Sequence, residues 1–469
     1  MSTHRSDIVE RDPGSYRDPS GYVFRRDGVL YRSIDGSYIE EWQAFLDSGL
    51  HDRLVEHGWL IPFEPAPLDL AADRASIAVL RPEPVEFVSY PYEWTFGQLK
   101  DAALVTLDVH RAALDEGFIL KDATAYNVQF RSGRPILIDS LSFERAREGA
   151  PWVAYRQFCE QFLAPLALMA YRDIRFGTWL REFLEGIPLD LASGLLPRRT
   201  MLRLGLLTHV HLHARAQRRY AARPTGAGQG EQSGPRISAS RQAALIESLR
   251  SAVAKLDWEP AGTEWADYAD RTSYGDVATR SKEELVARFV AEIGGRRVWD
   301  LGANTGRYSR IAASLGRSVV AFDIDPAAAE RHYRALAAEG RGDILPLVID
   351  LANPSPDLGW AHAERRSLAG RANADALLAL ALIHHLVIGR NVPMSFLSSY
   401  LAQLGPDLVI EFVPKTDPMV QLLLASRRDV FPDYSLAGFR AAFARRWEIL
   451  EEAPVEGSAR VLLRLSRRS

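Results

Sequence analysis

The stretch Val298–Gly306, VWDLGANTG, decides the fold of the C-terminal half of this chain. An apolar run ends at Asp300, a loop with two glycines follows, and a helical pattern begins near Arg307. Glycine permits tight turns and lets the backbone approach a ligand closely. A carboxylate directly before such a loop attracts a cationic ligand and repels a diphosphate. The stretch therefore predicts a strand, a loop and a helix that together bind a positively charged group.

A dinucleotide-binding loop is the alternative with the same local structure. Its fingerprint is G-x-G-x-x-G, and the pyrophosphate lies at the N-terminus of the helix that follows. Here the glycines are spaced as G-A-N-T-G, and Asp300 precedes them where a diphosphate would be repelled. Spacing and charge together disfavour a nicotinamide dinucleotide.

Strand and helix patterns alternate from this stretch towards the C-terminus. The strand segments, separated by helical ones, are RRVWDL, SVVAFDID, DILPLVIDL, ALLALAL and PDLVIEFV. Such alternation predicts a parallel sheet with helices on both faces. The last segments, RRWEILEEAPVE and SARVLLRLS, predict two further strands joined by a turn. The C-terminal region is therefore predicted to be an α/β domain.

Carboxylates stand at the ends of three successive predicted strands. Asp300 ends the first, Asp323 ends the second, and Asp350 follows the third. Because the carboxyl ends of parallel strands share one edge of the sheet, we expect these side chains to line one crevice. An acid at the end of the second strand accepts hydrogen bonds from ribose hydroxyls, a role that Asp325 can also fill. Asp350 is placed to meet an adenine amino group, with a solvated surface acid as the alternative.

These segments resemble a known family. DLGANTGRYSR, VVAFDID, the Asp350 position and DALLALALIHHL are similar to motifs I to IV of class I S-adenosylmethionine-dependent methyltransferases, over about residues 274–467. The resemblance implies a Rossmann-like, seven-stranded sheet ending in an antiparallel pair, S-adenosyl-L-methionine as cofactor, and methyl transfer to an acceptor that it does not name. It implies that the cofactor pocket is lined by Asp300, Gly302, Asn304, Gly306, Asp323, Ile324 and Asp350. IHHLVIGRNVP and IEFVPKTDPMVQ also resemble a group of bacterial methyltransferase-like proteins that includes nodulation-associated ones.

A methyltransferase needs a general base only when the acceptor carries a proton that must leave. The catalytic candidates follow the fourth and fifth predicted strands and are His384, His385 and Glu411, with Lys415 nearby. At least one of the two histidines is expected to have a structural role in packing and not a catalytic one. Upstream, Tyr268, Tyr274 and Lys282 are expected to form either a lid over the cofactor or a docking helix with a polar loop.

A second pattern occupies residues 21–220, which mix short strands with helices and are predicted to form an α+β domain. The segment KDATAYN precedes a strand, a turn and the strand end ILID at Asp139. It resembles the catalytic loop and the metal-binding aspartate of protein-kinase-like folds, including aminoglycoside phosphotransferases. The resemblance implies Asp122 as a base, Asn127 and Asp139 as magnesium ligands, and Mg-ATP as a cofactor of this domain.

The chain departs from the kinase pattern at several positions. No G-x-G-x-x-G loop precedes residue 120, no V-A-I-K strand is present, and Asp139 is followed by Ser-Leu-Ser. Arg32 is the residue expected to substitute for the missing lysine, with Glu40 or Glu41 as its expected partner. We therefore expect a degenerate kinase-like scaffold that binds substrate, a nucleotide or a partner, with an active phosphotransferase as the alternative.

Length and composition bound the domain organisation. A chain of 469 residues is expected to hold at least two domains. The stretch 221–240 is rich in Gly, Pro, Ser and Gln and is predicted to be a flexible linker between domains at 21–220 and 241–469. Residues 1–20 are predicted to be disordered.

Composition also limits the partners. A formal charge of −3 does not indicate that the chain binds nucleic acid, since nucleic-acid-binding domains usually carry an excess of basic residues. No apolar run reaches the roughly 20 residues that span a bilayer, and no signal peptide is recognisable, so we expect a cytoplasmic protein without a membrane partner. Cys159 is the single cysteine, which excludes an intrachain disulfide and a multi-cysteine zinc site.

Three functions are compatible with these patterns. The leading hypothesis is a methyltransferase whose kinase-like domain recruits or modifies the same substrate. The alternatives are an enzyme that both phosphorylates and methylates, and a non-catalytic binding scaffold. The methyl acceptor, a small molecule or a macromolecule, and the oligomeric state stay open.

Overall fold

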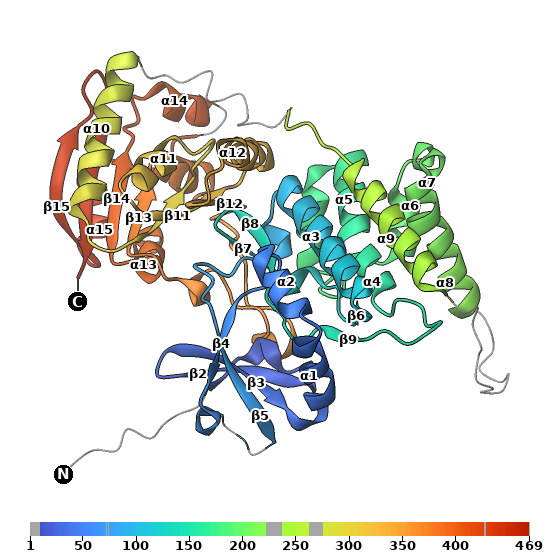
Figure 1. Cartoon of the computed structure of the whole chain (residues 1–469). Coiled ribbons are helices and arrows are strands. Elements are labelled where there is room, and N and C mark those ends of the chain that lie inside the picture. The colour runs from blue at the N-terminus through green and yellow to red at the C-terminus, as the bar shows by residue number, and fades with distance from the viewer. Residues whose placement is uncertain are drawn as a thin grey trace, which may run out of the picture. The chain divides into compact units, whose positions relative to one another are not determined.

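The computed structural model describes residues 10–71, 73, 75–221, 237–261, 275–425 and 428–468 (Figure 1). The chain divides into two compact units. The N-terminal unit extends to Trp258 and also includes Leu358–Arg365, whereas the C-terminal unit comprises Glu259–Asp357 and the chain from Arg366 onward. In the described part of the chain, no helix combines the length and the apolarity that crossing a membrane requires.

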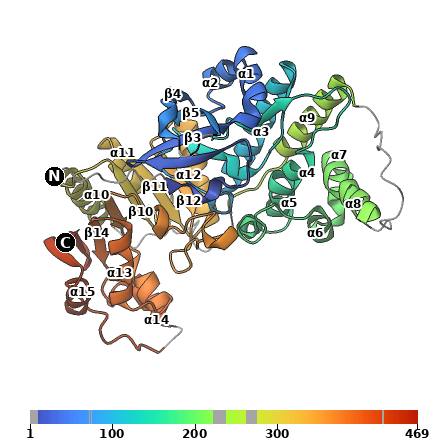
Figure 2. The ribbon, with the colours of Figure 1, turned by 90° about the horizontal axis from the view of Figure 1, so that it is seen from below.

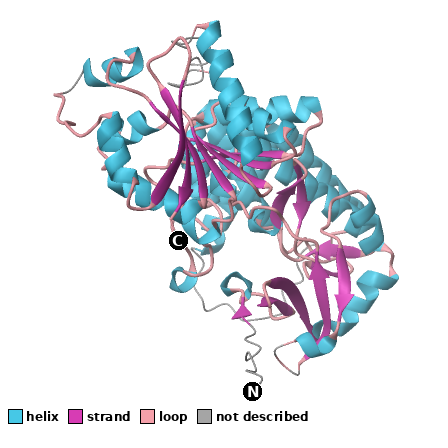
Figure 3. Cartoon of the chain, turned by 90° about the vertical axis from the view of Figure 1, so that its left-hand side faces the viewer, coloured by secondary structure: helices cyan, strands magenta, loops and turns pink. Residues whose placement is uncertain are grey.

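The C-terminal unit is built on one sheet, seven-stranded among the described residues (Figure 3). Its strands are β10 (Arg297–Leu301), β11 (Ser318–Asp323), β12 (Ile344–Val348), β13 (Ala376–Ala379), β14 (Asp407–Phe412), β15 (Trp447–Pro454) and β16 (Val461–Arg467). The order across the sheet is β12-β11-β10-β13-β14-β16-β15. The first five strands in this order are parallel, and β16 is antiparallel to both of its neighbours. The predicted Rossmann-like sheet with an antiparallel pair at its end is confirmed.

Helices cover both faces of this sheet, as the alternation of strands and helices predicts. They are α10 (Asp276–Glu292), α11 (Arg307–Ser314), α12 (Pro326–Glu339), α13 (Met394–Leu404), α14 (Pro418–Ala425) and α15 (Leu436–Phe443). Figure 2 shows α10 and α11 on one face and α13 and α15 on the other. Val286, Phe289 and Val290 recur at helical spacing on α10, and this apolar stripe packs into the core of the unit.

The N-terminal unit begins with an antiparallel sheet, which among the described residues has five strands in the order β1-β2-β3-β5-β4. These are β1 (Glu10–Arg11), β2 (Gly21–Arg26), β3 (Val29–Asp35), β4 (Phe63–Ala66) and β5 (Ser76–Pro82), with α1 (Ile39–Asp47) and α2 (Leu50–Glu56) between β3 and β4. Asp27 and Gly28 join β2 to β3 with φ of 51° and 79°. Positive φ at both positions is characteristic of a type I′ turn, so β2 and β3 form a tight hairpin.

The rest of the N-terminal unit consists of short strand pairs and many helices. α3 (Phe96–Asp115) precedes two antiparallel pairs, β6 (Phe118–Leu120) with β9 (Phe143–Arg145) and β7 (Val128–Arg131) with β8 (Arg134–Leu137). The helical part comprises α4 (Tyr155–Phe158), a π-helical segment (Cys159–Leu163), α5 (Ala164–Tyr171), a 3₁₀ helix (Ile174–Arg181), α6 (Leu189–Leu195), a 3₁₀ helix (Arg198–Leu202), α7 (Leu204–Leu206), a π-helical segment (Leu207–Leu212) and α8 (His213–Ala221). The unit is therefore α+β, as predicted.

The boundary between the units differs from the predicted one. α9 (Ala239–Ala254) packs against α3, and Arg250 pairs with Asp108 at 3.0 Å. The prediction that the C-terminal domain begins at residue 241 is therefore wrong, because this helix buries its apolar face in the N-terminal unit. Of the predicted linker, residues 222–236 lie outside the described residues.

The predicted disorder of the N-terminus is wrong for residues 10–20. There β1 pairs with β2, and the carboxylate of Asp12 accepts a hydrogen bond from Gly14 N at 2.9 Å to cap a 3₁₀ helix at Pro13–Ser15. Residues 1–9 lie outside the described residues.

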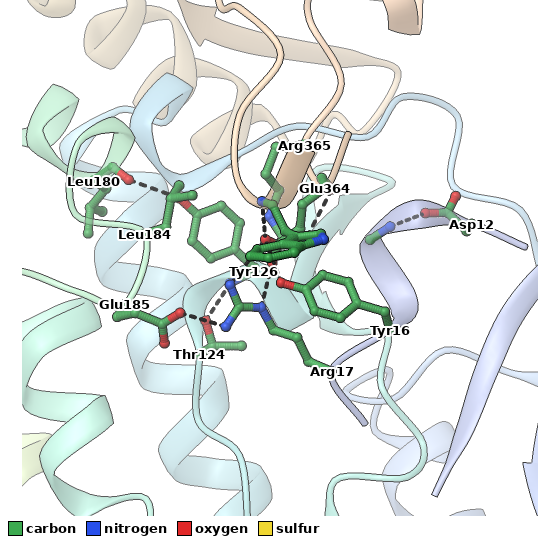
Figure 4. A network of polar contacts seen from close by, with 12 residues as sticks. Asp12, Tyr16, Arg17, Thr124, Tyr126, Leu180, Leu184, Glu185, Glu364 and Arg365 are labelled. Atoms are coloured by element: carbon green, nitrogen blue, oxygen red, sulfur yellow. Dashed lines mark hydrogen bonds and ion pairs between the residues drawn. The ribbon is translucent and has the colours of Figure 1, made fainter. Parts of the chain in front are cut away.

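One segment between β12 and β13 belongs to the N-terminal unit and is called here the 358–365 hairpin. Leu358 and Arg365 exchange both main-chain hydrogen bonds, at 2.9 and 3.0 Å. Arg17 donates from Nε and Nη2 to the two carboxylate oxygens of Glu364, at 2.8 and 3.1 Å (Figure 4). The Arg365 guanidinium lies 4.3 Å from the centroid of the Tyr126 ring. Two arginines thus fasten the hairpin to the N-terminal unit.

Candidate active site

The glycine loop of the C-terminal unit is tied to the carboxyl end of β11. Gly302 N and Ala303 N both donate to the carbonyl oxygen of Phe322, at 2.8 and 2.9 Å. Asn304 N donates to Oδ2 of Asp323 at 2.7 Å. β10 and β11 are parallel neighbours, so their ends meet at one edge of the sheet. The structure therefore brings Asp323 and the loop together, as the sequence predicts.

Asp300 and Asp323 are both buried carboxylates at this edge. Ser309 Oγ donates to Asp300 Oδ2 at 2.6 Å. Burial raises the pKa of Asp300 to about 6, against the opposing effect of Ser309. Burial likewise raises the pKa of Asp323 to about 6, although main-chain N–H groups, including that of Asn304, act to lower it. The raised pKa values indicate that the hydrogen bonds to these two carboxylates offset only part of the cost of burying their negative charge.

Asp325, the alternative to Asp323, has a different role. Its carboxylate accepts a hydrogen bond from Ala327 N at 2.8 Å and caps α12. The intervening Ile324 is exposed, with 42% of its surface accessible. Asp323 is therefore the carboxylate at the sheet edge, and Ile324 offers an apolar surface next to it.

Asp350 follows β12, the parallel neighbour of β11. Its Oδ1 accepts a hydrogen bond from Ala352 N at 2.8 Å, and its Oδ2 lies 3.7 Å from Nη2 of Arg390. The side chain is about one third exposed. Asp350 thus stands at the same edge of the sheet with part of its carboxylate accessible.

The two loop glycines serve different purposes. Gly302 and Gly306 both have left-handed φ, 80° and 83°. A Cβ at Gly302 would lie 3.3 Å from the Leu382 side chain, whereas one at Gly306 would lie 2.0 Å from the ring of His332 on α12. Gly306 is therefore required by the packing of α12 against the loop, which the sequence motif did not indicate.

His384 and His385 follow β13, and their ring centroids lie 4.0 Å apart. His384 is fully buried, and neither ring nitrogen has a hydrogen-bond partner among the described residues. Burial, with the nearby His385 and cations, lowers the pKa of His384 well below its ordinary value. Burial and Arg460 lower the pKa of His385 to about 4. Both imidazoles are therefore neutral at neutral pH, the form that can accept a proton.

The contacts of Glu411, one of the catalytic candidates, favour a structural role over that of a general base. Glu411 is fully buried on β14, and its Oε2 accepts hydrogen bonds from Lys282 Nζ at 2.6 Å and from Ala381 N at 2.7 Å. Its Oε1 lies 3.5 Å from Nη1 of Arg460. A carboxylate held by two cations is a poor proton acceptor. Ala381 has a φ of 50°, so Glu411 instead fixes the strained turn that leads to the histidines.

Lys282 is likewise not part of a lid. Its side chain on α10 is buried, with Nζ 4.6 Å from the centroid of the Tyr308 ring. Desolvation lowers the pKa of Lys282, and Glu411 counteracts this shift. Tyr268 and Tyr274, the other residues of the predicted lid, lie outside the described residues.

Arg460 and Asp417 complete a buried charge network that no pattern in the sequence indicates. Arg460 Nε pairs with Asp417 Oδ2 at 2.7 Å, so two cations face two carboxylates in the interior. Lys415, by contrast, pairs with the exposed Asp429 at 2.7 Å. A lysine in a charged helix such as TRSKEELV gives no signal that it is buried, and only the folded structure identifies its partner.

The N-terminal unit brings Asp122, Asn127 and Asp139 together. Asn127 Nδ2 lies 3.5 Å from Asp139 Oδ2 and 3.3 Å from Ser142 Oγ. Burial raises the pKa of Asp122, and the charge of Asp139 adds to this effect. The three predicted residues are therefore neighbours.

Asp139 is already paired within the protein. Arg32 on β3 and Ser142 both donate short hydrogen bonds to its carboxylate. Burial acts to raise the pKa of Asp139, but Arg32 and Ser142 outweigh it and lower the pKa. The expectation that Glu40 or Glu41 pairs with Arg32 is wrong, since Arg32 pairs with Asp139 instead; Glu41 Oε2 accepts from Arg145 N at 2.9 Å. Within the described ranges, no three His, Cys, Asp or Glu side chains are grouped to hold a metal ion.

Comparison with known proteins gives the family. No protein-family model matches the chain. The nodulation protein NoeA of Rhizobium meliloti (strain 1021) is 37% identical over 461 residues, which cover 97% of this chain and 96% of that protein. The chain belongs to the NoeA family. The nodulation-associated resemblance of the sequence is therefore confirmed, and both units are shared with NoeA because the alignment spans nearly the full length of each chain.

Solved structures, two of them of methyltransferases, are similar to part of this NoeA family member. Magnesium protoporphyrin IX methyltransferase of Synechocystis PCC 6803, with bound S-adenosylhomocysteine, is 20% identical and covers 43% of this chain and 94% of its own, with a TM-score of 0.31. The N-methyltransferase NodS of Bradyrhizobium japonicum WM9 is 11% identical, and the similarity covers 41% of this chain and 98% of NodS, with a TM-score of 0.31. WbdD is 16% identical, and the similarity covers 45% of this chain and 47% of WbdD, with a TM-score of 0.30. The fold assignment rests on the strand order of the C-terminal unit and not on these similarities.

Proposed function

We propose that the C-terminal unit binds S-adenosyl-L-methionine and is a methyltransferase. The observation that supports this most strongly is the glycine loop after β10, which is hydrogen-bonded to Asp323 while Asp300 lies buried at the adjacent strand end. Two carboxylates with pKa values raised to about 6 favour a ligand that brings positive charge. A dinucleotide would add negative charge at the same place.

The residues at the sheet edge fit this cofactor. Asp323 is placed to accept hydrogen bonds from ribose hydroxyls, Ile324 offers an exposed apolar surface to the adenine ring, and Asp350 keeps a partly accessible carboxylate for the adenine amino group. Asp300 supplies negative charge near the positively charged amino-acid end of the cofactor. When bound, the cofactor supplies an electrophilic methyl group on a sulfonium for in-line displacement.

The protein's own contribution to the chemistry is mainly positioning. Correct alignment of two reactants accounts for a large part of a rate enhancement. Glu411 holds the turn at Ala381, and this turn presents His384 and His385. Fully buried His384 cannot reach an acceptor, whereas the neighbouring His385 is only partly buried. We therefore propose His385 as the group that takes a proton when the acceptor carries one, with His384 packed against it.

Transfer of a labelled methyl group tests this function. Fractionated cell extract is incubated with the full chain and S-adenosylmethionine labelled in its methyl group. We expect label in a defined fraction with the unmodified protein and with Asp407→Asn, which removes a carboxylate at the opposite edge of the sheet. We expect none with Asp323→Asn. Equal labelling by Asp323→Asn would contradict the proposed site, and the labelled fraction would reveal the acceptor class.

We propose further that the N-terminal unit is a kinase-like scaffold that does not transfer phosphate. Arg32 on β3 contacts Asp139 at the end of a strand, and Asn127 lies beside the same carboxylate. The nucleotide site of a protein kinase likewise contains a cation on the third strand, a metal-binding aspartate and an asparagine. However, Arg32 and Ser142 engage the carboxylate of Asp139 that would have to bind magnesium. The donor set therefore fits Mg-ATP poorly, and a binding role is favoured over catalysis.

A thermal-shift series distinguishes the alternatives for this unit. A ligand that binds only the folded state raises the melting temperature. We expect no shift with ATP and magnesium. A shift that disappears in Asp139→Ala would instead support the enzyme with two activities, and failure of S-adenosylhomocysteine to shift the melting temperature would support the non-catalytic scaffold.

A further inference from the structure

An exposed apolar and basic surface lies in the N-terminal unit at Arg198–Leu204, called here the 198–204 segment. It comprises the 3₁₀ helix Arg198–Leu202 and the start of α7, which is labelled in Figure 1. Leu202 and Leu204 are 88% and 77% exposed, and Met201 is exposed as well. Single exposed apolar residues are common, but a cluster of large ones indicates a binding surface.

Three arginines lie among these apolar side chains. Arg198, Arg199 and Arg203 are exposed, and none of them forms an ion pair with a described residue. Residues 191–221 contain six arginines and no aspartate or glutamate. This stretch is thus strongly basic in a chain whose formal charge is −3. The surface pairs unneutralised positive charge with exposed apolar groups.

The backbone beneath this surface is ordered by packing. Thr200 is buried, and its hydroxyl donates to the Pro197 carbonyl at 2.7 Å and lies 2.9 Å from Nε2 of His211. A Cβ at Gly205 would lie 2.6 Å from the Ala252 side chain, so α7 packs closely on α9. The exposure of the leucines is therefore imposed by the fold, since the turns on either side are fixed.

We propose that the 198–204 segment inserts into the surface of an anionic lipid membrane. Met201, Leu202 and Leu204 enter the boundary between headgroups and acyl chains, and the arginines lie at the level of the lipid phosphates. Apolar insertion and attraction to anionic lipid act together in such interfacial binding. Arginine suits this depth because its aliphatic stem is buried while the guanidinium stays at the phosphates.

Charge complementarity favours a lipid surface over a protein partner. The exposed side chains of the segment are either apolar or cationic, and an anionic membrane complements both kinds at once because its phosphates lie directly above its acyl chains. The sequence predicts no membrane partner because no apolar run is long enough to span a bilayer. Binding to one leaflet needs no spanning helix, so the proposal replaces that expectation.

Vesicle cosedimentation with the full chain tests the proposal. The vesicles contain phosphatidylcholine alone or phosphatidylcholine mixed with phosphatidylglycerol. We expect the protein to sediment with the mixed vesicles, to bind the neutral ones more weakly, and to lose affinity as salt increases. The double variant Leu202→Asp with Leu204→Asp is expected to bind mixed vesicles about tenfold more weakly or worse, because it removes the apolar part and adds negative charge.

Matched variants separate insertion from general adhesion. Val153→Asp changes another exposed apolar residue of the same unit and is expected to retain binding. Replacing Arg198, Arg199 and Arg203 by glutamine is expected to abolish the preference for anionic vesicles. Thermal melts check that every variant is folded. The proposal is overturned if the protein sediments with neither kind of vesicle, or if the double aspartate variant binds mixed vesicles as tightly as the unmodified protein. It is also overturned if light scattering shows that the segment instead joins two copies of the chain.

Discussion

Lys282 and Glu411 form an ion pair in the interior of the C-terminal unit, with Nζ and Oε2 2.6 Å apart. The lysine lies on α10 and the glutamate on β14, 129 residues apart in the sequence. Glu411 also accepts the N–H of Ala381. The pair therefore joins a helix, a central strand and the turn before the two histidines, and it explains why a carboxylate at a strand end is structural here.

Removing the charge of Glu411 is expected to destabilise the protein strongly. Glu411→Gln leaves Lys282 buried without its carboxylate, and breaking a buried pair in this way typically costs about 3–5 kcal/mol. Urea unfolding followed by circular dichroism measures the loss. The matched control is Glu451→Gln, which breaks an exposed pair with Arg288 and is expected to leave the midpoint nearly unchanged. Equal midpoints for the two variants would show that the buried pair contributes nothing.

Gly306→Ala is expected to be far more harmful than Gly340→Ala. Both glycines have left-handed φ, but a Cβ at Gly306 would collide with the ring of His332, whereas one at Gly340 meets no atom within 4 Å. We expect a cost of about 1 kcal/mol at Gly340 and at least about 3 kcal/mol at Gly306. Thermal unfolding gives both values. If His332→Ala fails to relieve any of the Gly306→Ala cost, the packing explanation is incorrect.

Cofactor affinity is expected to fall as the pH drops below about 6. Asp300 and Asp323 have pKa values raised to about 6, so in the folded protein both gain protons in this range and lose the charge that favours a cationic ligand. A carboxyl group with a raised folded-state pKa binds more protons folded than unfolded, so the ligand-free protein also loses stability as the pH rises from about 4 to about 6. Titrations of S-adenosylmethionine above and below pH 6 test the first effect, and a constant affinity would refute it.

The 358–365 hairpin is expected to loosen when Glu364 loses its charge. Glu364→Gln weakens the hydrogen bonds from Arg17, and because Arg17 is half exposed the expected loss is only about 1 kcal/mol of local stability. Hydrogen exchange should rise in the hairpin while the sheet of the C-terminal unit is unaffected. Glu185 pairs with the same arginine at 2.9 Å but is mostly exposed, so Glu185→Gln serves as the control. Unchanged exchange in Glu364→Gln would show that other contacts hold the hairpin.

Local sequence patterns predicted the sheet and its edge correctly, because each strand and the loop after β10 have signatures within a few residues. Partners that lie far apart were not predictable. Nothing in the sequence assigns α9 to α3, and nothing pairs Arg32 with Asp139, 107 residues away. The contacts of Glu411 were not predictable for the same reason, since an acid in LVIEFV is compatible both with a catalytic role and with a buried ion pair.

Calorimetric titration of the full chain with S-adenosylhomocysteine tests the central claim most directly. We expect saturable binding by the unmodified protein and by Asp407→Asn, and a loss of affinity of about tenfold or more in Asp323→Asn. Absence of binding heat from the folded, unmodified protein, or the same affinity in Asp323→Asn, would contradict the assignment of this sheet edge as the cofactor site.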